Sequence, residues 1–151
     1  MDDGKTQGCS RRQFLAAVPA GIGAAALGAL LPACGGGPAI QGTVMVTNGV
    51  ATLTFIEFPA LMQAGGGVLV DAGGSPIAVA RTTATAAIAL DAVCTHAGCT
   101  LQWANGVSEL DCACHGSGFS PTGSVLRSPA RRALATYAAT ITASGIAVTV
   151  G

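Results

Sequence analysis

Charged side chains are scarce in this 151-residue sequence, and neither sign is in excess. Asp, Glu, Lys and Arg make up 9% of the residues, and the formal net charge at pH 7 is +0. Residues 34–151 alone carry four arginines against five acidic residues, a balance of about −1. A nucleic-acid-binding protein needs a strongly basic patch, so the composition argues against that class.

Aromatic residues are scarce too, at 4% of the chain. The core must therefore be built mainly from Val, Ile, Leu and Ala, and a small core of that kind gains stability from a disulfide or a metal centre. Histidine occurs only at His96 and His115, so few side chains are left for acid–base chemistry.

Each histidine lies in a segment of six residues, here called a box, that also contains two cysteines. The boxes read Cys94-Thr-His96-Ala-Gly-Cys99 and Cys112-Ala-Cys114-His115-Gly-Ser117. They place a C-x-H and a C-x-x-H ligand pair on two short loops, with one extra cysteine in each. Two thiolates and two imidazoles suit a [2Fe–2S] centre in which histidines replace two cysteines on one iron, and this replacement raises the reduction potential.

Two other interpretations of the boxes remain open at this point. Cys/His sets at short spacings commonly bind zinc, although zinc sites favour a C-x2-4-C pair and the C-x-H start departs from that pattern. A disulfide-stabilised secreted domain would use the cysteines but gives no reason for a histidine in each box. A zinc or disulfide structural domain would be colourless, unlike an iron–sulfur protein.

Over residues 85–150 the sequence resembles the Rieske [2Fe–2S] family, in its disulfide-containing cytochrome bc and arsenite oxidase small-subunit branch. The resemblance implies that the first cysteine of each box binds the inner iron and that each histidine binds the outer iron. These four ligands are Cys94, His96, Cys112 and His115. It also implies a disulfide between the two loops, formed by Cys99 and Cys114.

Residues beside the ligands are candidates for tuning the cluster. Gly98 and Gly116 let the backbone come close, so that amide N–H groups can donate to the cluster sulfurs. By the resemblance, Ser117 carries the hydroxyl that donates to a bridging sulfide, and Pro129 lies in a loop over the cluster. Phe119 stands where many high-potential members carry a tyrosine that donates to a ligand cysteine. Because phenylalanine cannot donate, we expect a potential below the top of the family.

The N-terminal segment resembles a twin-arginine export signal. Arg11 and Arg12 lie in Ser-Arg-Arg-Gln-Phe-Leu, and residues 14–33 continue without a charge, as in the hydrophobic region of a signal peptide. Twin-arginine export carries folded proteins, which suits a cluster inserted before export. The same stretch is long enough to span a bilayer, so an uncleaved helical anchor is the alternative.

A lipid-attachment sequence, Leu31-Pro-Ala-Cys34, ends the apolar segment, and Cys34 would be the acylated first residue of the mature protein. Several acyl chains anchor a protein stably where one does not. We therefore expect a signal peptide at residues 1–33, a lipidated cysteine and glycine-rich linker at 34–41, and a Rieske domain at 42–151. The mature protein would be periplasmic or extracytoplasmic and anchored to the membrane.

Short alternating segments separated by turn signals fill the rest of the chain. Asn48-Gly49 predicts a hairpin between residues 43–47 and 50–55, and Gly73-Gly74 predicts another between 68–71 and 77–81. Further strands are expected at 86–92, 107–111, 134–141 and 146–150, with a loop or one helical turn at 57–63. The pattern predicts an all-β antiparallel sandwich or small barrel. The resemblance implies the same fold with an inserted cluster-binding lobe at about 92–128.

These observations favour an exported, membrane-tethered protein that transfers one electron at a time through a Rieske [2Fe–2S] cluster. The alternatives are the Rieske subunit of a quinol-oxidising cytochrome bc-type complex and the small subunit of an arsenite oxidase-like enzyme. Its partner would be a redox protein, a cytochrome or an oxidase, with a quinol bound at a histidine in the first alternative. With both histidines used as ligands, no separate two-histidine, one-carboxylate iron site remains, so these residues do not make a complete enzyme alone.

Overall fold

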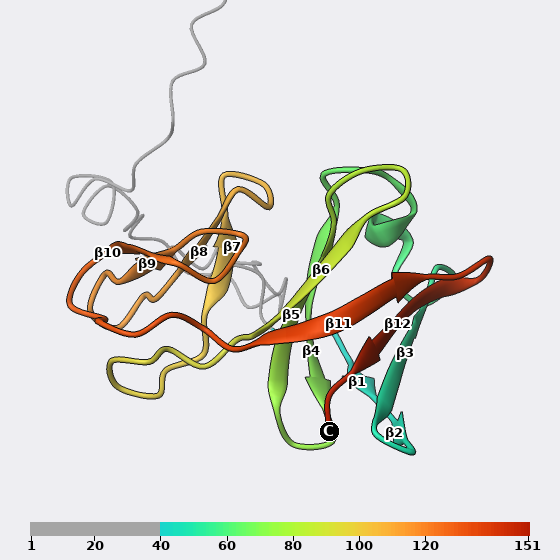
Figure 1. The fold of residues 1–151 in the computed structure, drawn as a ribbon, viewed down its shortest axis with the longest axis horizontal. Coiled ribbons are helices and arrows are strands. Elements are labelled where there is room, and N and C mark those ends of the chain that lie inside the picture. Colours follow the sequence, from blue (N-terminus) through green and yellow to red (C-terminus); the bar gives the residue numbers. More distant parts are fainter. Residues whose placement is uncertain (1–39) are drawn as a thin grey trace, which may run out of the picture. The chain divides into compact units, whose positions relative to one another are not determined.

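The computed structural model describes residues 40–151 (Figure 1). The predicted export signal with Arg11 and Arg12, the predicted lipidation site Cys34 and most of the glycine-rich linker lie outside the described residues. Among residues 40–151, no helix has the length and the apolar character to cross a membrane.

The predicted all-β fold is confirmed. A larger sheet has the strand order β1-β4-β5-β6-β11-β12-β3-β2, and a smaller one has the order β10-β9-β8-β7. The strands of the larger sheet are β1 (Thr43–Val44), β2 (Val46–Thr47), β3 (Val50–Thr54), β4 (Gly67–Ala72), β5 (Pro76–Arg81), β6 (Ala87–Asp91), β11 (Thr136–Ile141) and β12 (Gly145–Thr149). The smaller sheet contains β7 (Gln102–Ala104), β8 (Glu109–Asp111), β9 (Gly118–Phe119) and β10 (Val125–Arg127).

The larger sheet nearly closes on itself. Its two edge strands, β1 and β2, are consecutive in the chain and are separated only by Met45, so the two edges lie next to each other. All pairings are antiparallel except that of β1 with β4, which is parallel. Such closure removes most of the unpaired backbone that open sheet edges expose.

Both predicted hairpins are present. Asn48 and Gly49 have φ values of 52° and 76° between β2 and β3, as a type I′ turn requires, and Gly73 and Gly74 lie between β4 and β5. The region at 57–63 contains a single short 3-10 helix, η2 (Pro59–Met62). Strands β7, β9 and β10 were not predicted, because two or three residues are too few to display a period-2 alternation.

Two hydrophobic cores lie on opposite faces of β4 and β5. Val68 and Val70 belong to the core inside the larger sheet, whereas Leu69 belongs to the second core, which it shares with the lobe formed by the smaller sheet. Successive side chains of a strand point to opposite faces, so β4 serves both cores. Trp103 of β7 donates its indole N–H to the carbonyl of Val68 over 3.2 Å and is buried in the second core. The lobe that contains the two cysteine–histidine boxes is thereby packed against the larger sheet.

Candidate metal centre

The two boxes fold into loops with the same backbone pattern. In the first, the Cys94 N–H donates to the Cys99 carbonyl over 2.8 Å and the Gly98 N–H donates to the Cys94 carbonyl over 2.9 Å. In the second, Cys112 N–H donates to Ser117 and Gly116 N–H donates to Cys112, both over 2.8 Å. The fifth position is a glycine in each loop because it has a positive φ, 75° at Gly98 and 77° at Gly116, which side-chain-bearing residues rarely adopt.

The four predicted ligands come together from these two loops, with their sulfurs inside and their imidazoles outside. Cys94 and Cys112 are 2% and 1% exposed, belong to the second core, and are free thiols. His96 and His115 are exposed at the surface, and their rings meet edge to face with centroids 4.9 Å apart. This donor set fits a cluster with one buried, cysteine-bound iron and one outward, histidine-bound iron.

Backbone N–H groups are aimed at both sulfurs from equivalent loop positions. His96 and Ala97 donate to Cys94, and Cys114 and His115 donate to Cys112. Burial opposes ionisation of Cys94, but hydrogen bonds from the Cys112 thiol, these two N–H groups and Ser117 outweigh it and lower its pKa.

For Cys112, burial and the hydrogen bond that its thiol donates to Cys94 raise the pKa. The pKa values of the two thiols therefore shift in opposite directions. Converging N–H donors of this kind stabilise negative charge on sulfur, which a metal-bound thiolate carries.

Ser117 is fully buried and connects three segments. Its Oγ accepts the N–H of Ala130 over 3.0 Å, and its hydroxyl hydrogen bonds to the sulfur of Cys94. A hydroxyl can donate one hydrogen bond while its oxygen accepts another, so both contacts can form at the same time.

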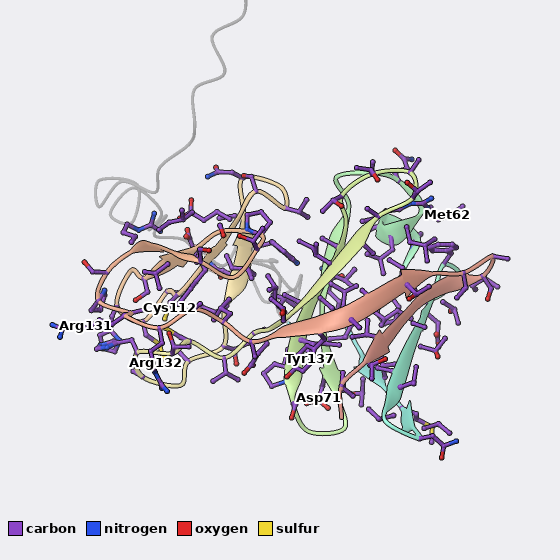
Figure 2. The ribbon with its side chains drawn as sticks, viewed as in Figure 1. Met62, Asp71, Cys112, Arg131, Arg132 and Tyr137 are labelled. Carbon is purple, nitrogen blue, oxygen red and sulfur yellow. A yellow bond between two sulfur atoms is a disulfide. The ribbon has the colours of Figure 1, made fainter. Side chains whose placement is uncertain are left out.

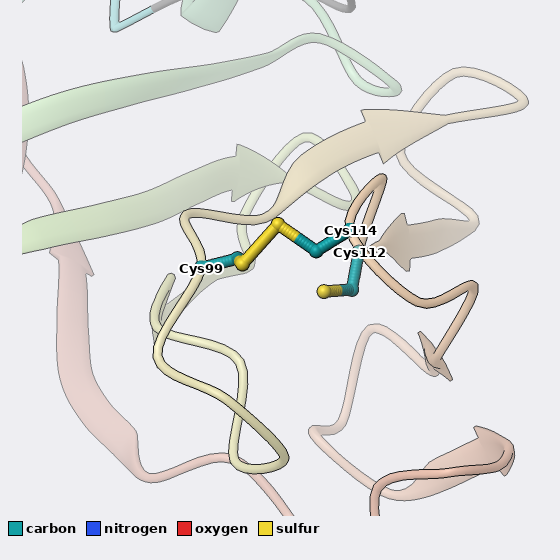
Figure 3. A group of neighbouring side chains, drawn as sticks. All are labelled: Cys99, Cys112 and Cys114. Carbon is teal, nitrogen blue, oxygen red and sulfur yellow. A yellow bond between two sulfur atoms is a disulfide. The ribbon is translucent and has the colours of Figure 1, made fainter.

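The remaining cysteine pair joins the loops, which confirms the predicted disulfide. Cys99 and Cys114 are bonded with an S–S distance of 2.09 Å and a Cα–Cα distance of 6.6 Å. The sulfur of Cys112 lies with theirs in a group spanning at most 4.8 Å (Figure 3). Cysteines bonded to each other supply no thiolate to a metal, so this trio is not a ligand set. Within residues 40–151, Cys94 and Cys112 are the two thiols left for binding.

The loop after β10 crosses beside both boxes. It contains the cis peptide Ser128–Pro129, and Pro129 lines a surface hollow together with His96. Thr95 in the first box donates its hydroxyl to the carbonyl of Arg132 over 2.7 Å, while Ala130 bonds to Ser117 of the second box. One loop therefore restrains both halves of the site.

Arg127 is a structural residue of the site that sequence reasoning missed. Its Nε donates to the Gly116 carbonyl over 2.8 Å, and its terminal nitrogens pair with Glu109 at 2.7 Å and Asp111 at 2.6 Å. The hydrogen bond to Asp111, with the charge of Glu109, raises the pKa of Arg127. Gly118 on the strand between them leaves the space, since a Cβ there would meet both Arg127 and Glu109. The sequence did contain a signal for this pairing: Glu109 and Asp111 are two positions apart, so both side chains lie on the same face of β8.

Phe119 is fully buried in the second core, where it pairs across the sheet with Leu110 and Val125. It belongs to the same core as Cys112 of the second box. Its role in this structure is packing, and the position is fixed by neighbours on both sides.

Comparison with known proteins places these features in context. The family model for the Rieske [2Fe-2S] domain matches residues 56–138. The chain is 32% identical over 148 residues to the cytochrome b6-f complex iron-sulfur subunit of Synechococcus sp. (strain WH7803), covering 89% of this chain and 82% of that protein. It is 35% identical over 145 residues to iron-sulfur subunit 2 of the same complex in Synechocystis sp. (strain ATCC 27184 / PCC 6803 / Kazusa), covering 87% and 79%.

Among solved structures, the cyanobacterial plasma membrane Rieske protein PetC3 from Synechocystis PCC 6803 is similar, with a TM-score of 0.52 and 31% identity. The match covers 63% of this chain and 93% of that one. The ferredoxin of carbazole 1,9a-dioxygenase from Nocardioides aromaticivorans IC177 shares the fold, with a TM-score of 0.51 at 20% identity over 65% of this chain and 93% of that one.

Proposed function

The chain belongs to the Rieske [2Fe-2S] family, and on that premise we propose that its four cluster ligands are Cys94, His96, Cys112 and His115. The observation that carries the assignment is the pair of loops with one backbone pattern, each presenting one buried thiol and one exposed imidazole. The bonded Cys99 and Cys114 are excluded as ligands.

The protein transfers electrons through a Rieske-type [2Fe–2S] cluster to a redox partner. The bound cluster supplies a one-electron couple of raised potential, because two neutral imidazoles stand in place of two thiolates. The protein's own residues hold the sulfurs in a water-poor core, aim N–H groups and the Ser117 hydroxyl at them, and leave the two imidazoles at the surface. Electrons can therefore leave through the histidine side.

Substitution of single ligands tests the assignment. Cys94→Ser, Cys112→Ser and His115→Ala should each abolish the visible absorption and the electron paramagnetic resonance signal of the reduced cluster. A matched control is the double variant Cys99→Ser/Cys114→Ser, which also removes two sulfurs but should still form the cluster. A colourless wild-type chain that binds zinc after anaerobic reconstitution would refute the proposal.

We further propose that residues 1–33 are a twin-arginine signal, that 34–41 are a lipidated cysteine and linker, and that 42–151 form the electron-carrying domain with its lobe at about 92–128. Support comes from the Arg11-Arg12 pair and the position of Cys34 after an apolar segment. The protein would then be attached to the membrane on its extracytoplasmic side. The similarity to a plasma membrane Rieske protein is consistent with this location.

Membrane fractionation with mass spectrometry of the N-terminus tests this anchor. Cys34→Ser should give an N-terminus without acyl chains and without cleavage before residue 34, whereas the control Cys9→Ser should change neither. Arg11→Lys/Arg12→Lys should leave the protein inside the cell. An intact chain starting at Met1 in the membrane would disprove lipidation and leave the apolar segment as a helical anchor.

A second candidate role is the iron–sulfur subunit of a quinol-oxidising cytochrome complex. The observation that favours it is the name of the similar relatives, which are cytochrome b6-f subunits. In that role an exposed imidazole, His96 or His115, would hydrogen-bond the quinol. Purification from membranes in mild detergent decides between the two. Stoichiometric b-type haem in the purified fraction supports the complex, and its absence supports the free carrier.

A further inference from the structure

Four arginines occur in residues 40–151, and two of them are already bound within the fold. Arg81 donates to the backbone carbonyls of Met62 and Ala84 over 2.8 and 2.6 Å. Arg127 is held by two carboxylates. In contrast, Arg131 and Arg132 are exposed, and their side chains form no salt bridge or hydrogen bond with the residues that the structure describes.

Both free arginines lie beside an exposed ligand histidine. They line a hollow of about 340 Å³ with Thr95, His96 and Pro129, and no acidic residue contributes to its lining. The hydrogen bond from Thr95 to the Arg132 carbonyl holds this segment against the first box. Figure 2 shows the two side chains extending outward from the loops around Cys112.

Three acidic side chains lie near this hollow, and two of them are paired with Arg127. Glu109 and Asp111 are paired with Arg127. Asp91 lines the neighbouring hollow with Arg132, but its carboxylate accepts the Val93 N–H over 2.9 Å and forms no salt bridge. The hollow that Arg131 and Arg132 line beside His96 is therefore cationic, with Asp91 as the one acidic residue of the hollow next to it.

We propose that Arg131, Arg132 and His96 form a docking surface for a redox protein that presents acidic side chains around its own centre. This inference rests on the proposed function, because it places the partner at the histidine side of the cluster. Electrostatic attraction between exposed charges acts within a Debye length, about 8 Å at physiological ionic strength. Two positive charges next to His96 would raise the rate at which an acidic partner is encountered, and would orient that partner for electron transfer.

The test uses two acceptors with the same haem and opposite surface charge: native cytochrome c, which is basic, and succinylated cytochrome c, whose lysines carry carboxylates instead. The full-length chain with its cluster is reduced and mixed with each acceptor by stopped flow. The variant Arg131→Gln/Arg132→Gln should react about tenfold more slowly with the succinylated acceptor at an ionic strength of about 0.01 M. The difference should shrink as salt is added.

Two controls separate the surface from other effects. Thr52→Glu/Thr140→Glu places the same charge change on exposed residues of β3 and β11 in the larger sheet, and should slow the succinylated acceptor by less than twofold. Native cytochrome c should react with the arginine variant at least as fast as with the wild type.

A double arginine variant that keeps the wild-type rate with succinylated cytochrome c at low salt would overturn the docking surface. Equal slowing with both acceptors would overturn it too, since that would indicate a changed cluster and not a changed surface. The cluster spectrum of each sample is recorded first. A chain without that spectrum refutes the proposed function itself, so the two failures are distinguishable.

Discussion

Removal of the Ser117 hydroxyl should lower both the reduction potential and the stability of the protein. Ser117 is fully buried, its hydroxyl donates to Cys94 Sγ, and its oxygen accepts the Ala130 N–H over 3.0 Å. Ser117→Ala deletes the donor and leaves a buried N–H without a partner. The two losses act on different quantities and can be measured separately.

The size of each effect follows from these contacts. A hydrogen bond to a charged group contributes about 1.5–3 kcal/mol, and a difference of about 1.4 kcal/mol between the reduced and oxidised states corresponds to about 59 mV for one electron. The reduced cluster is more electron-rich and holds the bond more strongly, so the potential should fall by tens of millivolts, roughly 60 mV at most from such a difference. The orphaned N–H of Ala130 should cost about 1–3 kcal/mol in the free energy of unfolding.

Protein-film voltammetry and urea unfolding of the wild type and Ser117→Ala measure the two quantities. Thr95→Val is the matched control, because it removes a hydroxyl from the other box that bonds to a backbone carbonyl and not to a sulfur. Its potential should stay at the wild-type value. A Ser117→Ala protein with reduced stability and an unchanged potential would refute the reasoning, since the hydroxyl would then not donate to a cluster ligand.

Three further predictions follow from the site and the sheet. Phe119→Tyr should raise the potential by roughly tens of millivolts in voltammetry if the new hydroxyl donates to a ligand sulfur; a lowered potential would show that it does not. Cys99→Ser/Cys114→Ser should reduce the free energy of unfolding by about 3 kcal/mol in urea titrations, because the disulfide closes a loop of 15 residues; an unchanged midpoint and slope would contradict this. Burial and the nearby charge of Asp91 raise the pKa of Tyr137, so ionisation above its unfolded value of about 10 destabilises the folded state. Wild type should therefore lose more stability than Tyr137→Phe between about pH 9 and about pH 11, and equal losses would argue against a raised pKa for this partly buried phenol.

Much of the fold and the site could be predicted because the relevant signals are local. Asn48-Gly49 predicts its hairpin, since only residues tolerant of positive φ complete that turn. The two boxes contain their own loop geometry, with a glycine at the fifth position of each. The ligand set remains a prediction, and it rests on the resemblance of the two boxes to the Rieske family.

Other features depended on distances between residues far apart in the chain. Arg127, Arg131 and Arg132 look equivalent in the sequence, yet Arg127 is bound by acids sixteen and eighteen positions earlier, while the other two stay free beside His96. No local pattern distinguishes them, because the pairing of Arg127 requires β10 and β8 to flank a strand whose glycine leaves room.

The sequence by itself predicted the chemistry of the centre: which side chains are candidate iron ligands, which turns present them, and that the fold is all-β. The tertiary structure alone decided how that chemistry is placed. It aims the Ser117 hydroxyl at Cys94, buries both thiols against β4 and β5, and leaves both imidazoles at the surface. The reason is physical: donor sets are properties of residues, whereas burial, hydrogen-bond direction and charge compensation exist only between segments that folding brings together.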